Sequence, residues 1–87
     1  MHNRSREEII ASILEASTSP SKKTLVMFNS RLSYCQLAAY FPSLQEKGLI
    51  SSDKGLWTIT EKGREYIHAY RMISEIIESK PLVQVLR

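Results

Sequence analysis

The sequence has 87 residues, which is room for one domain with a small core, and its formal net charge of +3 leans weakly toward an anionic partner. The single cysteine, Cys35, excludes an internal disulfide, and His2 and His68 have no ligand-spaced neighbours, so we expect no metal and no cofactor. No uncharged apolar run approaches the ~20 residues of a membrane span, and residues 1–8 are charged and unlike a signal peptide, so we expect a cytoplasmic protein.

The first predicted helix runs from about Ser5 to Ser17. Ser5 and Glu8 have the spacing of a capping box, in which each residue satisfies a backbone amide at the helix start. The apolar residues that follow at helical period are Ile9, Ile10, Ile13 and Leu14. Residues 18–23 are predicted to form a loop, because Pro20 lacks a backbone donor and restricts the residue before it.

A short second helix is predicted from Lys23 or Thr24 to Phe28. This segment is too short for periodicity to separate helix from strand, so the context decides. Residues 29–32 have the composition of a turn, and Ser33 then begins another helix. Two helices joined by a turn of about three or four residues form a helix-turn-helix.

The third predicted helix runs from about Ser33 to Lys47. Ser33 and Gln36 again have capping-box spacing, and Gly48 suits a left-handed C-terminal cap. The predicted buried stripe consists of Leu37, Phe41 and Leu44, flanked by Tyr34 and Tyr40. Pro42 conflicts with this helix, because an interior proline costs about 3 kcal/mol. We expect a kink there or a break into two segments.

After Gly48 the pattern changes to short β-forming runs. Leu49–Ile50 and Leu56–Ile59 are predicted strands, joined by turn-forming residues 51–55. A two-stranded hairpin is not stable alone, so it must lie on the helices.

The last predicted helix begins after Thr60, with Glu61 in its first turn, and runs to about Ser79. Tyr66, Tyr70, Ile73 and Ile77 are spaced four, three and four residues apart, which is the spacing of a coiled-coil seam. Ile67 and Ile76 widen this apolar stripe. The predicted dimer interface consists of Tyr66, Tyr70, Ile73, Ile76 and Ile77. We expect residues 1–60 to form the core, residues 61–80 a dimerisation helix, and residues 81–87 a short apolar tail.

This order predicts an α+β, mainly α fold: a winged helix-turn-helix with a three-helix core, a two-stranded hairpin wing and a long C-terminal helix. In such a fold the second helix of the pair enters the major groove, and the wing loop reaches the backbone or the minor groove. We therefore expect the chain to bind double-stranded DNA as a homodimer, in the cytoplasm or nucleoid. The candidate DNA-binding residues are Lys22, Lys23, Arg31, Ser33, Tyr34, Gln36, Ser43 and Lys54, and Arg4 and Arg6 are candidates for an N-terminal arm.

Each of these residues also has a purely structural interpretation. Ser33 and Gln36 can act only as helix caps, and Tyr34 can belong to the flank of the core. The lysines and arginines can be solvated surface charges, so their case rests on being clustered near one helix end.

The sequence also resembles a known family, through "LSYCQL", "EKGLI" and "TITEKG" above all. It is similar to the archaeal winged helix-turn-helix DNA-binding proteins that dimerise through a C-terminal antiparallel coiled coil. This resemblance covers about residues 6–77 and implies a DNA-binding dimer that acts as a transcriptional regulator or a chromatin-associated protein. It also places Ser33, Tyr34 and Gln36 at the start of the recognition helix and Lys54 in the wing.

Two other classes of function compete with DNA binding. The chain has no paired nucleophile and base, no metal-ligand motif and no glycine-rich phosphate loop in its sequence, so we expect no enzyme activity. Winged helices also serve as protein-interaction modules in transcription or replication assemblies, because a fold does not fix its function. That alternative stays open at this point.

Overall fold

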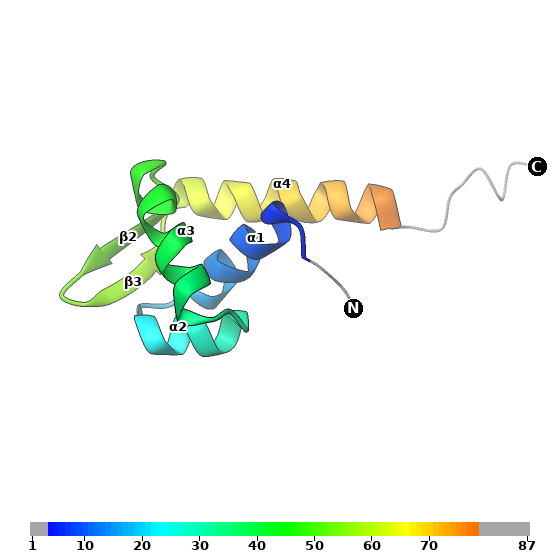
Figure 1. Cartoon of the computed structure of the whole chain (residues 1–87). Coiled ribbons are helices and arrows are strands. Elements are labelled where there is room, and N and C mark those ends of the chain that lie inside the picture. Colours follow the sequence, from blue (N-terminus) through cyan, green and yellow to red (C-terminus); the bar gives the residue numbers. More distant parts are fainter. Residues whose placement is uncertain (1–3, 79–87) are drawn as a thin grey trace, which may run out of the picture.

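The computed structural model describes residues 4–78, which form four helices and a three-stranded antiparallel sheet (Figure 1). In chain order the elements are α1 (Arg6–Ala16), β1 (Ser21–Lys22), α2 (Lys23–Ser30), α3 (Tyr34–Glu46), β2 (Ile50–Asp53), β3 (Leu56–Ile59) and α4 (Glu61–Glu78). The predicted α+β, mainly helical architecture is confirmed. The predicted tail, residues 81–87, lies outside the described residues.

Both predicted capping boxes are present. At the start of α1 the Glu8 amide donates to Ser5 Oγ at 3.1 Å, and the Ser5 amide donates to Glu8 Oε1 at 2.8 Å. At the start of α3 the corresponding bonds between Ser33 and Gln36 are 3.1 and 3.0 Å long. Local sequence therefore fixes where these two helices begin, because the exposed amides of a first turn need such partners.

The predicted hairpin is present as β2 and β3, but the loop predicted over residues 18–23 contains a third strand that the sequence did not predict. Ser21 and Lys22, in the segment predicted as a loop, form β1 and pair with β3 opposite Trp57 and Leu56. The sheet order is β1-β3-β2. A strand of two residues carries no alternating pattern, so its pairing depends on where the fold brings the free edge of β3.

Helix α2 is longer than predicted, and the turn after it is shorter. Ser30, assigned to the turn from its composition, is the last residue of α2 and is 2% exposed. Its hydroxyl donates to the Val26 carbonyl at 2.6 Å, so a buried serine is satisfied inside the helix. Arg31 then ends the helix in a left-handed conformation with φ of 60°.

Helix α3 runs through Pro42 as one element, so of the two expected outcomes the break into two segments was wrong, and the kink stays a prediction. Pro42 itself is exposed. Phe41 and Leu44, close to it on the inner side, are only 3% and 1% exposed. Their packing on the core holds the helix together across a residue that lacks a backbone donor.

The wing turn is also tighter than predicted. Strand β2 extends to Asp53, which pairs with Leu56, so only Lys54 and Gly55 connect the two strands. Both have positive φ, 53° and 81°. This is the pattern of a type I′ hairpin turn, whose twist matches that of the flanking strands.

The core lies between the helices and one face of the sheet. Its fully buried aliphatic side chains are Ile13, Leu14, Val26, Leu37, Leu44 and Ile50. At the sheet, the Phe41 and Trp57 rings stack with centroids 4.1 Å apart. Ile67 is 6% exposed and belongs to this core, although the sequence assigned it to the seam on α4.

Thr60 caps α4 as predicted and also ties it to the end of α3. Its hydroxyl accepts from the Gly63 amide at 3.0 Å and donates to the Gly48 carbonyl at 2.6 Å. The first turns of α4 therefore lie against the hairpin. The second half of α4 extends past the rest of the domain in Figure 1.

Candidate nucleic-acid interface

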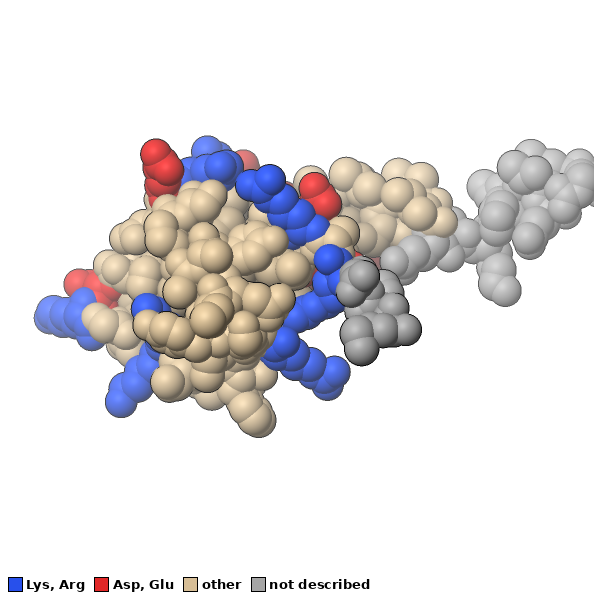
Figure 2. Space-filling model, viewed as in Figure 1, with Lys and Arg blue, Asp and Glu red and all other residues tan. Residues whose placement is uncertain are grey.

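The outward face of α3 is exposed to solvent, and most of its side chains are small. Leu37, Phe41 and Leu44 turn one side of the helix into the core, which leaves the opposite side in solvent. The residues exposed on that side include Cys35, Ala38, Ala39 and Pro42. The only carboxylate in α3 is Glu46, in its last turn. Figure 2 shows the middle of this face free of acidic side chains, with Lys and Arg side chains around its rim.

The start of α3 is occupied by its own capping box. Because the Gln36 side-chain carbonyl accepts one hydrogen bond from the Ser33 amide, that side chain keeps one acceptor site and both –NH₂ donors for a ligand. The Ser33 hydroxyl accepts from the Gln36 amide and can still donate. The structural role expected for both residues is confirmed, and a role in binding stays a prediction.

Arg31 precedes the cap of α3 by two residues and is exposed. The turn that carries it is held by Arg4, whose guanidinium donates to the Ser30 carbonyl at 2.9 Å and to the Arg31 carbonyl at 3.2 Å. The same group donates to Ser12 Oγ at 3.0 Å. Arg4 therefore joins α1 to the end of α2 and positions Arg31, whereas the sequence offered it only as part of an arm.

Lys22 and Lys54 lie at the sheet. Strand β1 places Lys22 opposite Leu56, the residue that directly follows the wing turn. Lys54 occupies that turn beside Asp53, and both lysines are exposed. The sheet thus brings together two of the predicted cations that are 32 positions apart in the sequence.

Lys23 and Tyr34 contact each other instead of standing apart. The Lys23 Nζ lies 5.5 Å from the centre of the Tyr34 ring and 5.7 Å from that of Phe41. Such contacts stabilise by about 0.5–1 kcal/mol at exposed sites. Lys23 is half-buried, while Tyr34 remains 60% exposed at the edge of the outward face.

Ser43 lies at the border between the outward face of α3 and the side of the helix that faces α1. It is half-buried, and its hydroxyl accepts from Lys47 Nζ at 3.3 Å. It lines a hollow that Ile10 and Arg6 of α1 also line. Of the eight predicted residues, Ser43 is therefore the one that the fold turns toward α1.

A family model described as winged helix-turn-helix matches residues 3–78. The chain belongs to the winged helix-turn-helix family. In this winged helix, α2 and α3 are the helix pair and β2–β3 is the wing.

Among solved structures, the winged helix is similar to a crystal structure of Sso10a-2, a DNA-binding protein from Sulfolobus solfataricus. The sequences are 24% identical, the TM-score is 0.76, and the match covers 86% of this chain and 83% of that chain. At this identity the similarity supports the fold alone. The comparison with curated proteins gave no match.

The predicted dimer residues run along α4 from Tyr66 to Ile77, and the three isoleucines among them lie in its second half. Ile73, Ile76 and Ile77 are 56%, 73% and 74% exposed. Tyr66 and Tyr70, one turn apart, are half-buried, with rings nearly parallel and centroids 6.4 Å apart. Burial, and secondarily the charge of Glu7, raises the pKa of Tyr66, whose hydroxyl donates to the Glu7 carbonyl at 3.2 Å. The apolar stripe thus runs from the domain edge outward along the helix.

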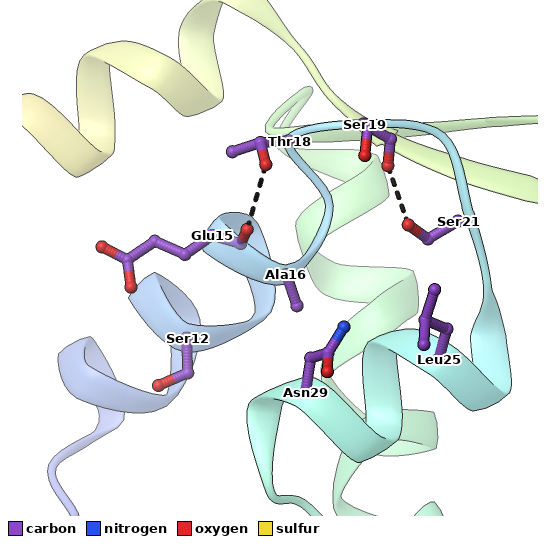
Figure 3. A pocket seen from close by; sticks show the side chains of 8 residues that line it. All are labelled: Ser12, Glu15, Ala16, Thr18, Ser19, Ser21, Leu25 and Asn29. Atoms are coloured by element: carbon purple, nitrogen blue, oxygen red, sulfur yellow. Dashed lines mark hydrogen bonds between the residues drawn. The ribbon is translucent and has the colours of Figure 1, made fainter.

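A hollow of about 370 Å³ lies between α1, the loop after it and α2, and hydroxyl groups such as Thr18 and Ser21 in it bond to nearby backbone carbonyls (Figure 3). Within residues 4–78 no group of three or more His, Cys, Asp or Glu side chains could hold a metal ion. In the same range, none of the helices combines the length and apolarity needed to cross a bilayer.

Proposed function

We propose that this winged helix binds double-stranded DNA as a homodimer, with α3 in the major groove and residues 51–55 on the backbone or the minor groove. The observation that carries this proposal is the outward face of α3, which is exposed, small and free of carboxylates until its last turn. A helix must present such a face to fit closely between two phosphate backbones. The description of Sso10a-2 as a DNA-binding protein supports the same function for this chain.

The chemistry of that face favours binding with little sequence selectivity. Ala38, Ala39 and Pro42 have no side-chain groups that can hydrogen-bond to a base edge. Cations at the rim contact phosphates, which carry no sequence information. We therefore propose a chromatin-associated role ahead of an operator-specific regulator.

The homodimer is proposed from α4. The exposed isoleucines lie on a part of α4 that extends past the rest of the domain, and a stripe of this kind in water favours association. The spacing of Tyr66, Tyr70, Ile73 and Ile77, four, three and four residues apart, fits a coiled-coil seam. The family resemblance of the sequence implies an antiparallel coiled coil, which would place the two copies of α3 at opposite ends.

Substitutions of Gln36 separate capping from DNA contact. Gln36→Glu keeps an acceptor at the third helical position but removes the –NH₂ donors, so stability should change by less than about 0.5 kcal/mol. Gln36→Ala removes the reciprocal bond and should cost about 0.5–1 kcal/mol. If Gln36 contacts DNA, both variants weaken duplex binding; chemical denaturation and a binding titration measure the two effects. A loss of stability alone would restrict Gln36 to capping.

Neutralising the rim cations should weaken binding to all duplexes about equally. The variant Lys22→Gln/Arg31→Asn/Lys54→Asn removes three charges, and asparagine tolerates the left-handed backbone of the last two positions. The slope of log K against log salt should become shallower by about 0.9 for each phosphate that the variant no longer neutralises. Arg64→Gln, an exposed cation on α4, is the matched control and should leave the slope unchanged. An unchanged slope in the triple variant would remove these residues from the interface.

The proposed function itself is tested by selection from random duplexes at two salt concentrations. We expect binding at low salt, a steep loss of affinity with added salt, and weak enrichment of any one sequence. Strong enrichment would favour a sequence-specific regulator. Absence of binding to any long duplex at low salt would overturn DNA binding.

One observation favours the alternative, a protein-interaction module. On α2, Leu25 and Phe28 lie one turn apart and are 49% and 76% exposed. Exposed large apolar side chains of this kind often mark protein contacts. The alternative predicts that the wild-type chain binds a stoichiometric protein partner and that the Phe28→Ser variant does not. If this is observed and neither the wild-type chain nor the variant binds a duplex, the interaction module replaces the DNA-binding proposal.

A further inference from the structure

A groove lies where α1, the end of α3 and the start of α4 meet. Its volume is about 520 Å³, which is within the range of roughly 300–1,000 Å³ typical of small-molecule sites. Ile10, Leu49 and the Tyr66 ring give it apolar walls. Leu49 is 7% exposed, and Tyr66 is held by its hydrogen bond to the Glu7 carbonyl, so these walls are fixed by the fold.

Three cations from three different elements line the same groove. Arg6 is the first residue of α1, Lys47 caps the end of α3, and Lys62 lies in the first turn of α4. Glu7 is the carboxylate among the lining residues. Figure 2 shows a row of Lys and Arg side chains along the upper part of the molecule, where α3 and α1 approach α4. The groove therefore combines apolar walls with a net positive rim.

One of these cations is positioned by a backbone contact. Lys62 Nζ donates to the Lys47 carbonyl at 2.9 Å, which satisfies one of the carbonyls that end α3. An ammonium group has three donors, so two remain for a ligand. The contact fixes a positive charge at the groove.

The groove continues along α1. An adjoining hollow of about 370 Å³ shares Arg6, Ile10 and Lys47 with it and adds the side chains of Ala39, Tyr40 and Leu44. An elongated ligand could therefore lie with its body along Ile10 and its charged end among the cations. A small hydrated anion such as phosphate would leave the apolar walls unused.

We propose that this groove binds an amphipathic carboxylate, with a medium-length alkyl chain or a flat aromatic body against Ile10, Leu49 and Tyr66. The carboxylate pairs with Lys47, Lys62 and Arg6, since charge-assisted bonds orient such groups in apolar sites. The groove itself contains none of the residues named on the outward face of α3, although Ala39 of that face borders the adjoining hollow, and ligand binding does not require DNA binding. Its occupant links three elements that meet at the end of α3, so binding stabilises the folded chain by mass action.

The test titrates the full chain with decanoate, decanol and acetate. Backbone amide NMR should show saturable binding of one decanoate per chain, with shifts centred on Ile10, Leu49 and Tyr66, and the melting temperature should rise. Decanol lacks the charge and acetate lacks the apolar body, so each should bind at least tenfold more weakly.

Charge variants decide whether the cations act as proposed. Lys47→Gln/Lys62→Gln should lower the decanoate affinity at least tenfold, whereas Lys54→Asn/Arg64→Gln, with the same loss of charge elsewhere, should leave it unchanged. Because Lys62 also binds the end of α3, Arg6→Gln provides a second variant that does not involve this contact, and it too should weaken binding. Circular dichroism confirms that each variant is folded.

Four outcomes would overturn the proposal. The first is equal affinity for decanol and decanoate, and the second is a set of shifts located elsewhere on the chain. The third is unchanged decanoate affinity in the folded groove variants. The fourth is absence of decanoate binding while a random duplex or a second copy of the chain shifts the amide signals of Ile10, Leu49 and Tyr66. That result would assign the groove to the macromolecule that causes the shifts. Failure of DNA binding would leave the titrations with decanoate, decanol and acetate and the comparison of the charge variants unaffected.

Discussion

Gly63→Ala should lower the free energy of unfolding of this domain by at least about 3 kcal/mol. In a small domain of marginal stability, a loss of this size unfolds a large fraction of the molecules. A Cβ at position 63 would lie 2.3 Å from the Leu49 carbonyl oxygen and 2.6 Å from Ile59 Cγ1. The carbonyl belongs to the backbone and cannot turn aside as a flexible side chain would. Helix α4 would therefore have to move away from the hairpin, which breaks the hydrogen bonds made by Thr60. Chemical denaturation followed by circular dichroism measures the loss.

Gly55→Ala is the matched comparison for this substitution. A Cβ at position 55 meets nothing within 4 Å, but the backbone there has φ of 81°. Only the conformational penalty applies, so we expect a cost of about 1–2 kcal/mol. If the two variants were equally stable, the close approach of α4 to the hairpin would not be the source of the effect.

Ile73→Glu/Ile77→Glu should convert the proposed dimer into monomers. Each substitution places a charge in a seam that must exclude water, and burying an unpaired carboxylate costs several kcal/mol. Light scattering should show the mass fall from twice 10.0 kDa to 10.0 kDa. The same variant should bind a duplex with two half-sites much more weakly, since the two copies of α3 no longer act together.

His68→Glu serves as the control for this variant. His68 is exposed on α4 but lies on the side opposite the isoleucine stripe, so an added carboxylate there should leave the mass unchanged. A wild-type chain that is already monomeric, or a double variant that keeps the dimer mass, would contradict the assigned seam. Circular dichroism should show both variants folded, because Ile73 and Ile77 are more than half exposed in the single chain.

Helix starts that depend on residues close together in the chain could be predicted from the sequence. Capping boxes fixed the starts of α1 and α3, because the two residues that make each box are only three positions apart. Strand β1 could not be predicted, since its two residues become a strand only by pairing with residues of β3 that lie 34 and 36 positions away in the sequence. The continuity of α3 through Pro42 could not be predicted for the same reason, because the packing of Phe41 and Leu44 outweighs a local penalty that is visible in the sequence alone.

The candidate site divides in the same way. The sequence identified the cations and the cap of α3, because charge and residue type are visible without a fold. It did not reveal that Lys23 lies over the rings of Tyr34 and Phe41, nor that Arg4 holds the turn before α3. These interactions join residues far apart in the chain. The groove at the end of α3 was missed because Arg6, Lys47 and Lys62 share no local motif.

The two non-glycine residues with positive φ among residues 4–78 are both cations, Arg31 and Lys54. Glycine or asparagine would adopt that backbone more easily, and a left-handed conformation costs an ordinary side chain roughly 1 kcal/mol or more. Both positions therefore hold a positive charge at the expense of conformational ease. Replacing Arg31 and Lys54 with glycine or asparagine should therefore raise the melting temperature. The same replacements would remove two of the positive charges that are proposed to contact the DNA backbone.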